Sequence, residues 1–109
     1  MPTGRLGTAN ITTTSNTTIY TVPSSTFSVV SVSVCNRNAS TAATIRIAVA
    51  SSASPNPDEY IEYDTSLVGS GVVERTGLVM KATEVLVVQV SSASPTVSVV
   101  AMGIETSTA

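Results

Sequence analysis

The chain has 109 residues, of which 42% are hydrophobic and only 11% are charged, and its formal net charge at pH 7 is -2. This length gives room for one hydrophobic core, and an apolar composition with few charges is unlike that of disordered chains, so we expect a single folded domain. The five basic residues are dispersed and histidine is absent, which argues against nucleic-acid binding and excludes sites that depend on imidazole.

Period-2 alternation of β-branched and polar residues dominates the sequence, and no segment carries a helical stripe. We expect an extended, partner-contacting N-terminal segment at residues 1–10, a sandwich domain at residues 11–105 and a C-terminal tail at residues 106–109. Strands are expected at residues 11–14, 17–22, 27–36, 43–50, around 58–64, 72–80, 84–91 and 96–105. In the long strand at 27–36, Val30, Val32 and Val34 are expected to face the core, and Gly77 predicts a bulge or bend in its strand.

Seven to eight short strands separated by turn residues are typical of a β-sandwich or a small barrel, and we expect an all-β, single-domain β-sandwich. Its path is expected to be a Greek key, of either the jelly-roll or the immunoglobulin-like kind. Burial of about twenty aliphatic side chains would exceed the entropy cost of folding only narrowly. Because association relieves such marginal stability, we expect a homo-oligomer, with a trimer favoured.

The stretch DEYIEYD, residues 58–64, holds four of the seven carboxylates of the chain. On a strand, its even-numbered residues would form a solvated face, while Ile61 and Tyr63 would be buried on the other. A calcium site needs oxygens that converge from a loop, and a glycosidase needs two carboxylates facing each other across a cleft. The stretch therefore predicts a solvated or ion-pairing surface, and we expect no catalytic, cofactor-binding or metal site in the chain.

Five charged residues are candidates for ion pairs or for contacts with neighbouring subunits: Arg5, Glu62, Asp64, Glu74 and Arg75. Glu74 and Arg75 are adjacent, so on a strand they must point to opposite sides. Arg75 has two possible roles: it pairs internally with Glu62 or Asp64, or it anchors a neighbouring subunit.

Six short motifs are spread over nearly the whole chain. In order, they are GRLGT (4–8), IYTVP (19–23), VCNRN (34–38), YIEYD (60–64), ERTGLVM (74–80) and GIE (103–105). This series resembles small virion structural proteins of tailed bacteriophages, particularly of phages that infect cyanobacteria. The resemblance implies a non-enzymatic β-sandwich assembly module, present in many copies and often as a symmetric oligomer.

The function expected from this resemblance is that of a capsid decoration or cement protein in the virion, which is assembled in the host cytoplasm. Its partners would be the major capsid protein or tail proteins, with no role for nucleic acid or, since no apolar run reaches membrane-spanning length, for a membrane. The alternative is a tail, neck or fibre component that binds host-surface glycans, although aromatic residues are only 4% of the chain and tryptophan is absent. A third hypothesis, an enzyme that uses Glu62 and Asp64 of the acidic strand, is the least favoured.

Overall fold

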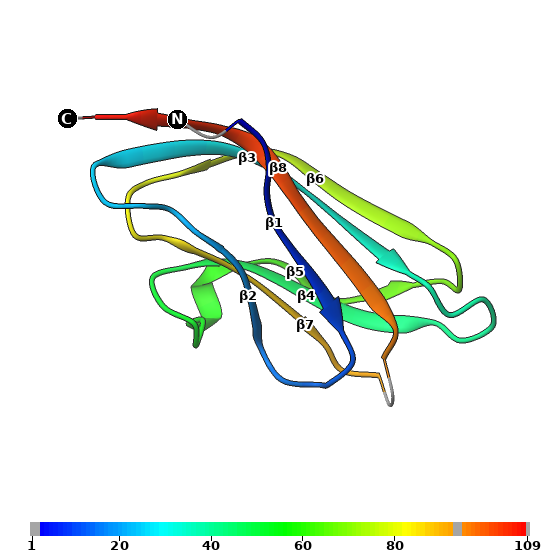
Figure 1. Cartoon of the computed structure of the whole chain (residues 1–109). Helices are drawn as coiled ribbons and strands as arrows, with labels where there is room; N and C mark the ends of the chain where they lie inside the picture. Colours follow the sequence, from blue (N-terminus) through cyan, green and yellow to red (C-terminus); the bar gives the residue numbers. More distant parts are fainter. Residues whose placement is uncertain (1–2, 93–94, 109) are drawn as a thin grey trace.

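The computed structural model describes residues 3–92 and 95–108, and these form a nearly all-β sandwich of two layers (Figure 1). The strands are β1 Thr3–Ile11, β2 Thr17–Thr21, β3 Thr26–Asn36, β4 Ala43–Ala50, β5 Tyr60–Leu67, β6 Val72–Met80, β7 Val85–Val90 and β8 Val97–Ser107, and a short 3-10 helix, η1, spans Pro57–Glu59. Within the described residues, no helix has the length and hydrophobicity needed to cross a bilayer.

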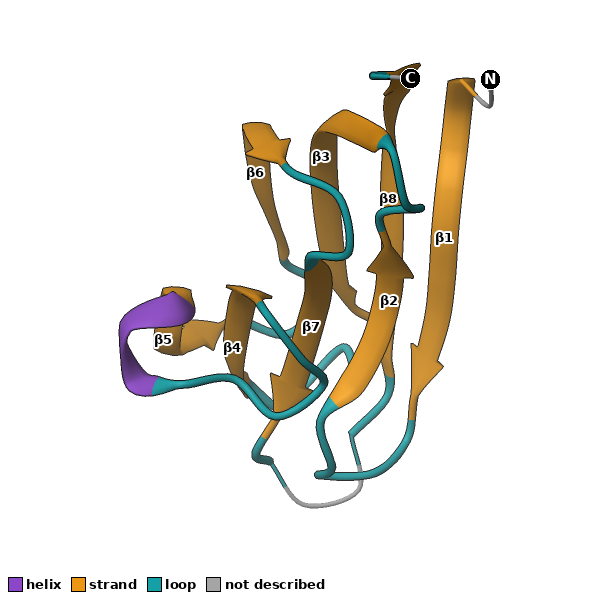
Figure 2. Cartoon of the chain, turned by 90° about the vertical axis from the view of Figure 1, so that its left-hand side faces the viewer, coloured by secondary structure: helices purple, strands orange, loops and turns teal. Residues whose placement is uncertain are grey.

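The two layers are antiparallel sheets of four strands each. Sheet A has the order β1-β8-β3-β6, and sheet B has the order β2-β7-β4-β5. Apart from the β4–β5 connection, every connection between consecutive strands passes from one sheet to the other (Figure 2). This strand order is that of a jelly roll, so the structure confirms the expected β-sandwich and selects one of the two Greek-key paths.

The core lies between the sheets and follows the alternation of the sequence. Val30, Val32 and Val34 of β3 are all buried, as predicted. The largest fully buried side chains on the facing strands of sheet B include Ile45, Ile47, Leu86, Val88 and Val90. Because one face of each strand carries these residues, packing the two inner faces removes them from water together.

Two glycines shape sheet A. Gly77 has a φ of +69° and lies where the pairing register between β3 and β6 shifts, so the predicted bulge is present. A Cβ atom at Gly103 would overlap the carbonyl oxygen of Val29 on the neighbouring strand. The glycine of the GIE motif is therefore explained by the close approach of two backbones.

The ends of the chain differ from the sequence-based expectation. Residues 12–16 form a loop, so the strand expected at 11–14 is only the end of a longer one. That strand, β1, pairs with β8 from Thr3 onward, so the sandwich starts well before residue 11. At the other end, β8 extends to Ser107 and takes up part of the expected tail. Residues 1–2 and 109, which belong to the same expectations, lie outside the described residues.

Candidate interaction surface

The first two acidic residues of DEYIEYD do not belong to the strand. Asp58 and Glu59 lie in η1, and the Glu59 carboxylate accepts hydrogen bonds from the backbone N–H groups of Asn56 (2.7 Å) and Ser51 (3.0 Å). These bonds, with that from Asn56 the stronger influence, lower the pKa of Glu59. Glu59 therefore closes the loop between β4 and β5, which is a structural role.

Glu62 and Arg75 form an ion pair between the two sheets. The Glu62 carboxylate accepts hydrogen bonds from the Thr65 hydroxyl (2.6 Å) and from Arg75, which also donates to the Ile61 carbonyl (3.3 Å). The Thr65 bond first, and then Arg75, lower the pKa of Glu62. β5 is the edge strand of sheet B and β6 that of sheet A. The pair therefore links the sheets along one open side, which is the internal role considered for Arg75.

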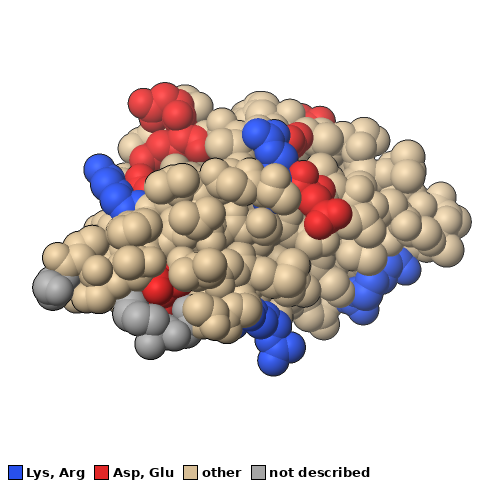
Figure 3. Space-filling view, turned by 90° about the horizontal axis from the view of Figure 1, so that it is seen from above, with Lys and Arg blue, Asp and Glu red and all other residues tan. Residues whose placement is uncertain are grey.

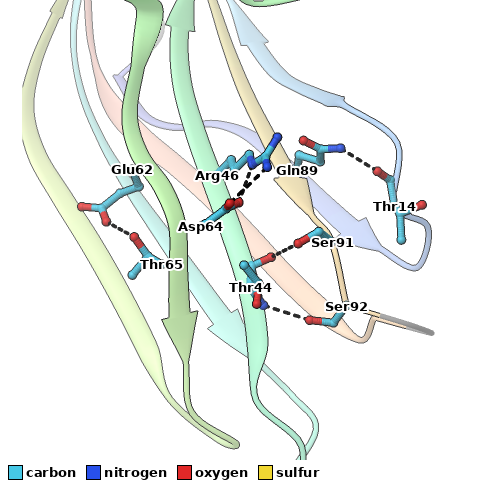
Figure 4. Close-up of polar contacts among 9 residues, drawn as sticks. All are labelled: Thr14, Thr44, Arg46, Glu62, Asp64, Thr65, Gln89, Ser91 and Ser92. Atoms are coloured by element: carbon cyan, nitrogen blue, oxygen red, sulfur yellow. Dashed lines mark hydrogen bonds and ion pairs between the residues drawn. The ribbon is translucent and has the colours of Figure 1, made fainter. Parts of the chain in front are cut away.

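Asp64 pairs instead with Arg46 of β4, a residue outside the five candidates (Figure 4). The guanidinium donates from Nε to Oδ1 (2.5 Å) and from Nη2 to Oδ2 (3.2 Å), and this contact lowers the pKa of Asp64. Arg46 also lies over the ring of Tyr63, 4.1 Å from its centroid. In the strand at 43–50, alternation places Arg46 on the opposite side from Ile45 and Ile47. Because that strand pairs with β5, this outward position is the feature of the sequence that points to Arg46 as a partner of the acidic strand.

The expectation that Tyr63 is buried was wrong, since the residue is 58% exposed. The register between β4 and β5 shifts twice, and Asp64 has a φ of 53°. Such irregularities break the strict alternation of faces on which the expectation depended.

Tyr63 lines a shallow hollow beside η1. The hollow has a volume of about 460 Å³ and is formed with Tyr60, Pro55 and Pro57. The two tyrosine rings meet edge to face, with centroids 5.0 Å apart and an interplanar angle of 78°. Two of the three tyrosines of the chain, both in DEYIEYD, thus meet at one place, although strict alternation predicted them on opposite faces of the strand.

The outer face of sheet B has its own apolar cluster, and part of the chain packs on it. Ala48 and Ala50 of β4 pair with Val87 and Val85 of β7 on the side away from the core, yet all four are buried. Tyr60, at the end of η1, packs against them. Local chain segments therefore shield this apolar area from water.

The outer face of sheet A also has an apolar area, which we call the apolar face. It consists of Phe27 (38% exposed), Val29 (42%), Val79 (71%), Met102 (40%) and Ile104 (55%). Val29 is paired with both Val79 and Ile104, so these three side chains form a row across β6, β3 and β8. Seen from this side, the charged side chains form separate small groups with a broad area of other residues between them (Figure 3). Contiguous exposed apolar areas of this kind mark interaction sites.

Arg5 and Glu74 lie on the same outer face, at its opposite edges. Arg5 is opposite Met102 on edge strand β1, and Glu74 is opposite Ser33 on edge strand β6. Both are exposed, and among the described residues neither takes part in an ion pair. Of the five candidates, the structure thus brings together only Glu62 and Arg75.

A buried polar cluster at one end of the sandwich was not anticipated from the sequence. The Tyr20 hydroxyl contacts Ser28 Oγ (2.7 Å) and donates to the Glu105 carboxylate, and all three residues are buried. Burial first, and then the hydrogen bond to Glu105, raise the pKa of Tyr20 to about 12. The partners satisfy one another and all three residues are buried, which suits a structural contact.

In the part of the chain that the structure describes, no three acidic or cysteine side chains are grouped so that they could hold a metal ion. No protein-family model matches the chain, and none of the curated proteins is significantly similar to it. The surfaces described above are therefore the basis for a functional proposal.

Proposed function

We propose that the chain is a non-enzymatic structural protein of a bacteriophage virion, and specifically a capsid decoration or cement protein. The observation that carries this proposal is the apolar face of sheet A. The exposed fractions of its five residues range from 38% at Phe27 to 71% at Val79. The apolar cluster on sheet B, by contrast, is buried, and Tyr60 packs against it. An exposed apolar sheet face suits a protein whose task is to pack against other subunits.

Two further features support the same role. The six motifs that resemble phage virion proteins now have structural explanations at several positions, such as Gly103 against Val29 and Glu62 against Arg75. The jelly roll is an architecture used by viral capsid proteins, although this support is an analogy at the level of the fold, and lectins use it as well. The partner in the particle would be the major capsid protein or a tail protein.

This role can be tested on purified particles of the phage that encodes the chain. Antibodies against the purified protein should label the capsid surface in electron micrographs, and the protein should rebind particles from which it has been stripped. Val29→Asp and Val79→Asp should weaken rebinding, because a carboxylate would be buried in the contact. Val68→Asp is the matched control, since Val68 is 65% exposed but lies in the turn after β5. Absence of the protein from particles would refute the proposal.

The second candidate function is a tail, neck or fibre component that binds host-surface glycans. The hollow at Tyr60 and Tyr63 favours it, because sugar rings pack on aromatic faces and the Arg46–Asp64 pair places polar groups beside them. A glycan array probed with the wild-type chain and with Tyr63→Ala tests this candidate. Selective binding that the substitution abolishes would favour it, together with labelling of the tail. Absence of binding would leave decoration as the better proposal.

A further inference from the structure

We infer that the apolar face of sheet A is the contact surface of a two-fold dimer, in which Arg5 of each copy pairs with Glu74 of the other. The occupant of the face is thus a second copy of this chain. This dimer rests on the same apolar face that carries the proposed function, and in it the subunit that covers the face is a second copy rather than a capsid protein. The dimer differs from the trimer that the sequence led us to expect. Nothing in the structure tests the trimer, and the experiment below distinguishes the two.

The positions of the two charges are self-complementary. Arg5 lies in the row of Met102, and Glu74 lies in the adjacent row of Val100 and Ser33, about 7 Å further along the strands. Consider a two-fold axis that runs parallel to the strands, midway between β8 and β3 and between the two stacked faces. A rotation about this axis places β1 of one copy over β6 of the other. Each residue keeps its position along the strand direction. Each arginine then comes within reach of one glutamate, giving two equivalent pairs.

The same rotation brings apolar residues together at the centre. Val29 on β3 comes to lie over Ile104 of the second copy, because β3 and β8 are the central strands of sheet A. These two residues are in the same row, so the rotation keeps them at the same level. Facing sheets pack about 10 Å apart with interdigitated side chains, which is the geometry of a sandwich interior.

The apolar face would supply about half of the surface that a standard interface takes from each partner. If a fully exposed side chain of these types presents about 150–200 Å², the five exposed fractions leave roughly 400 Å² of apolar residue surface. A standard interface takes about 800 Å² from each partner, with an apolar centre and a polar rim. Ser31, Ser33, Thr8 and Thr106 lie around the apolar residues on this face and would supply the rim.

Pairing of sheet edges is the other way in which two copies could join, and the structure disfavours it. β1 has a register shift between Arg5 and Gly7, and β6 has one at Gly77. Bulges at both edges of sheet A interrupt the regular row of N–H and C=O groups that another strand would need. Contact through the face is therefore favoured over contact through the edge.

Charge reversal gives the decisive experiment, with the full chain studied by sedimentation over a range of concentrations. We expect a dimer whose Kd rises about tenfold in Arg5→Glu and in Glu74→Arg, because each substitution places like charges together. The double variant should return to within about threefold of the wild type, since it restores two opposite pairs. Asp58→Arg, at an exposed position in η1 beside sheet B, is the control for a change of net charge and should leave the Kd unchanged.

Val29→Asp tests the apolar centre and should yield a monomer, with circular dichroism and thermal unfolding used to show that the variant is folded. A monomeric wild type at all concentrations, or a trimer, would overturn the inference. Two single charge reversals that weaken association without rescue in the double variant would overturn the pairing of Arg5 with Glu74. Arg5→Glu that rebinds particles at a concentration at which the variant is monomeric and the wild type is dimeric would show that the proposed function does not need this dimer. A wild type that dimerises but does not rebind particles would leave the dimer and refute the function.

Discussion

The hydroxyl of Tyr20 donates a hydrogen bond to the carboxylate of Glu105, although 85 residues separate the two in the chain. Tyr20 belongs to sheet B, whereas Glu105 and its cross-strand neighbour Ser28 belong to sheet A. The bond therefore ties the two sheets together at one end of the sandwich. It also gives a buried carboxylate the partner without which its burial would be costly.

Replacing Tyr20 by phenylalanine should destabilise the fold by about 1–3 kcal/mol, because the Glu105 carboxylate loses a buried hydrogen-bond donor. Urea unfolding at neutral pH measures this change. The matched control is Tyr63→Phe, whose ring is 58% exposed and whose substitution should change stability by no more than about 0.5 kcal/mol. Equal effects of the two substitutions would contradict a special role for the buried hydroxyl.

Stability should also fall in alkaline solution because of Tyr20. Its pKa is raised to about 12 in the folded protein, against about 10 in the unfolded chain. The folded state thus keeps a proton that the unfolded state releases. Its stabilising effect is complete below about pH 10 and is lost as the pH rises to about 12, by up to about 2 kcal/mol. Unfolding of the wild type and of Tyr20→Phe measured across this range should converge; parallel curves would exclude the effect.

At acid pH, the ion pair of Glu62 with Arg75 should lose its stabilising effect. The pKa of Glu62 is lowered in the folded protein by Thr65 and Arg75, so its stabilising effect is present above the unfolded pKa and is lost as the pH falls through the folded one. Glu62→Gln should cost about 0.5–1 kcal/mol at neutral pH, since the pair is partly exposed, and should reduce the sensitivity to acid. Asp58→Asn, at an exposed position in η1, is the control. Thermal unfolding as a function of pH is the measurement.

Asn36 should be among the most sensitive polar positions. It is 1% exposed, and its amide group donates to the carbonyl oxygens of Thr41 (2.9 Å), Leu67 (3.2 Å) and Val68 (3.2 Å). Asn36→Ala should therefore cost about 2–3 kcal/mol, because it leaves buried carbonyl groups without a donor. Asn16→Ala, at an exposed loop position, should be close to neutral in the same denaturation experiment. A similarly small effect at Asn36 would mean that water replaces the amide.

Much of the β-sandwich could be predicted from the sequence. The strands expected at 43–50 and 72–80 have the bounds of β4 and β6, and the three inward valines of β3 are buried. Alternation with a period of two residues is a local property, because it follows from the direction of successive side chains on a strand. The bulge at Gly77 is local in the same sense, since it depends on the backbone freedom of one residue.

The candidate site depended on contacts between distant segments, which a local pattern does not specify. β1 became a strand because β8 lies beside it, although its sequence TGRLGTANI has little strand propensity. Ala48 points away from the core, yet it is buried by the packing of Tyr60. Likewise, Tyr63 is exposed because the register between β5 and β4 shifts. Arg75 pairs with Glu62 rather than with Asp64 because the edge strands β5 and β6 lie next to each other at the position of Glu62. Alternation thus fixed the two faces of most strands, whereas the path of the chain through the jelly roll decided which outer face is covered.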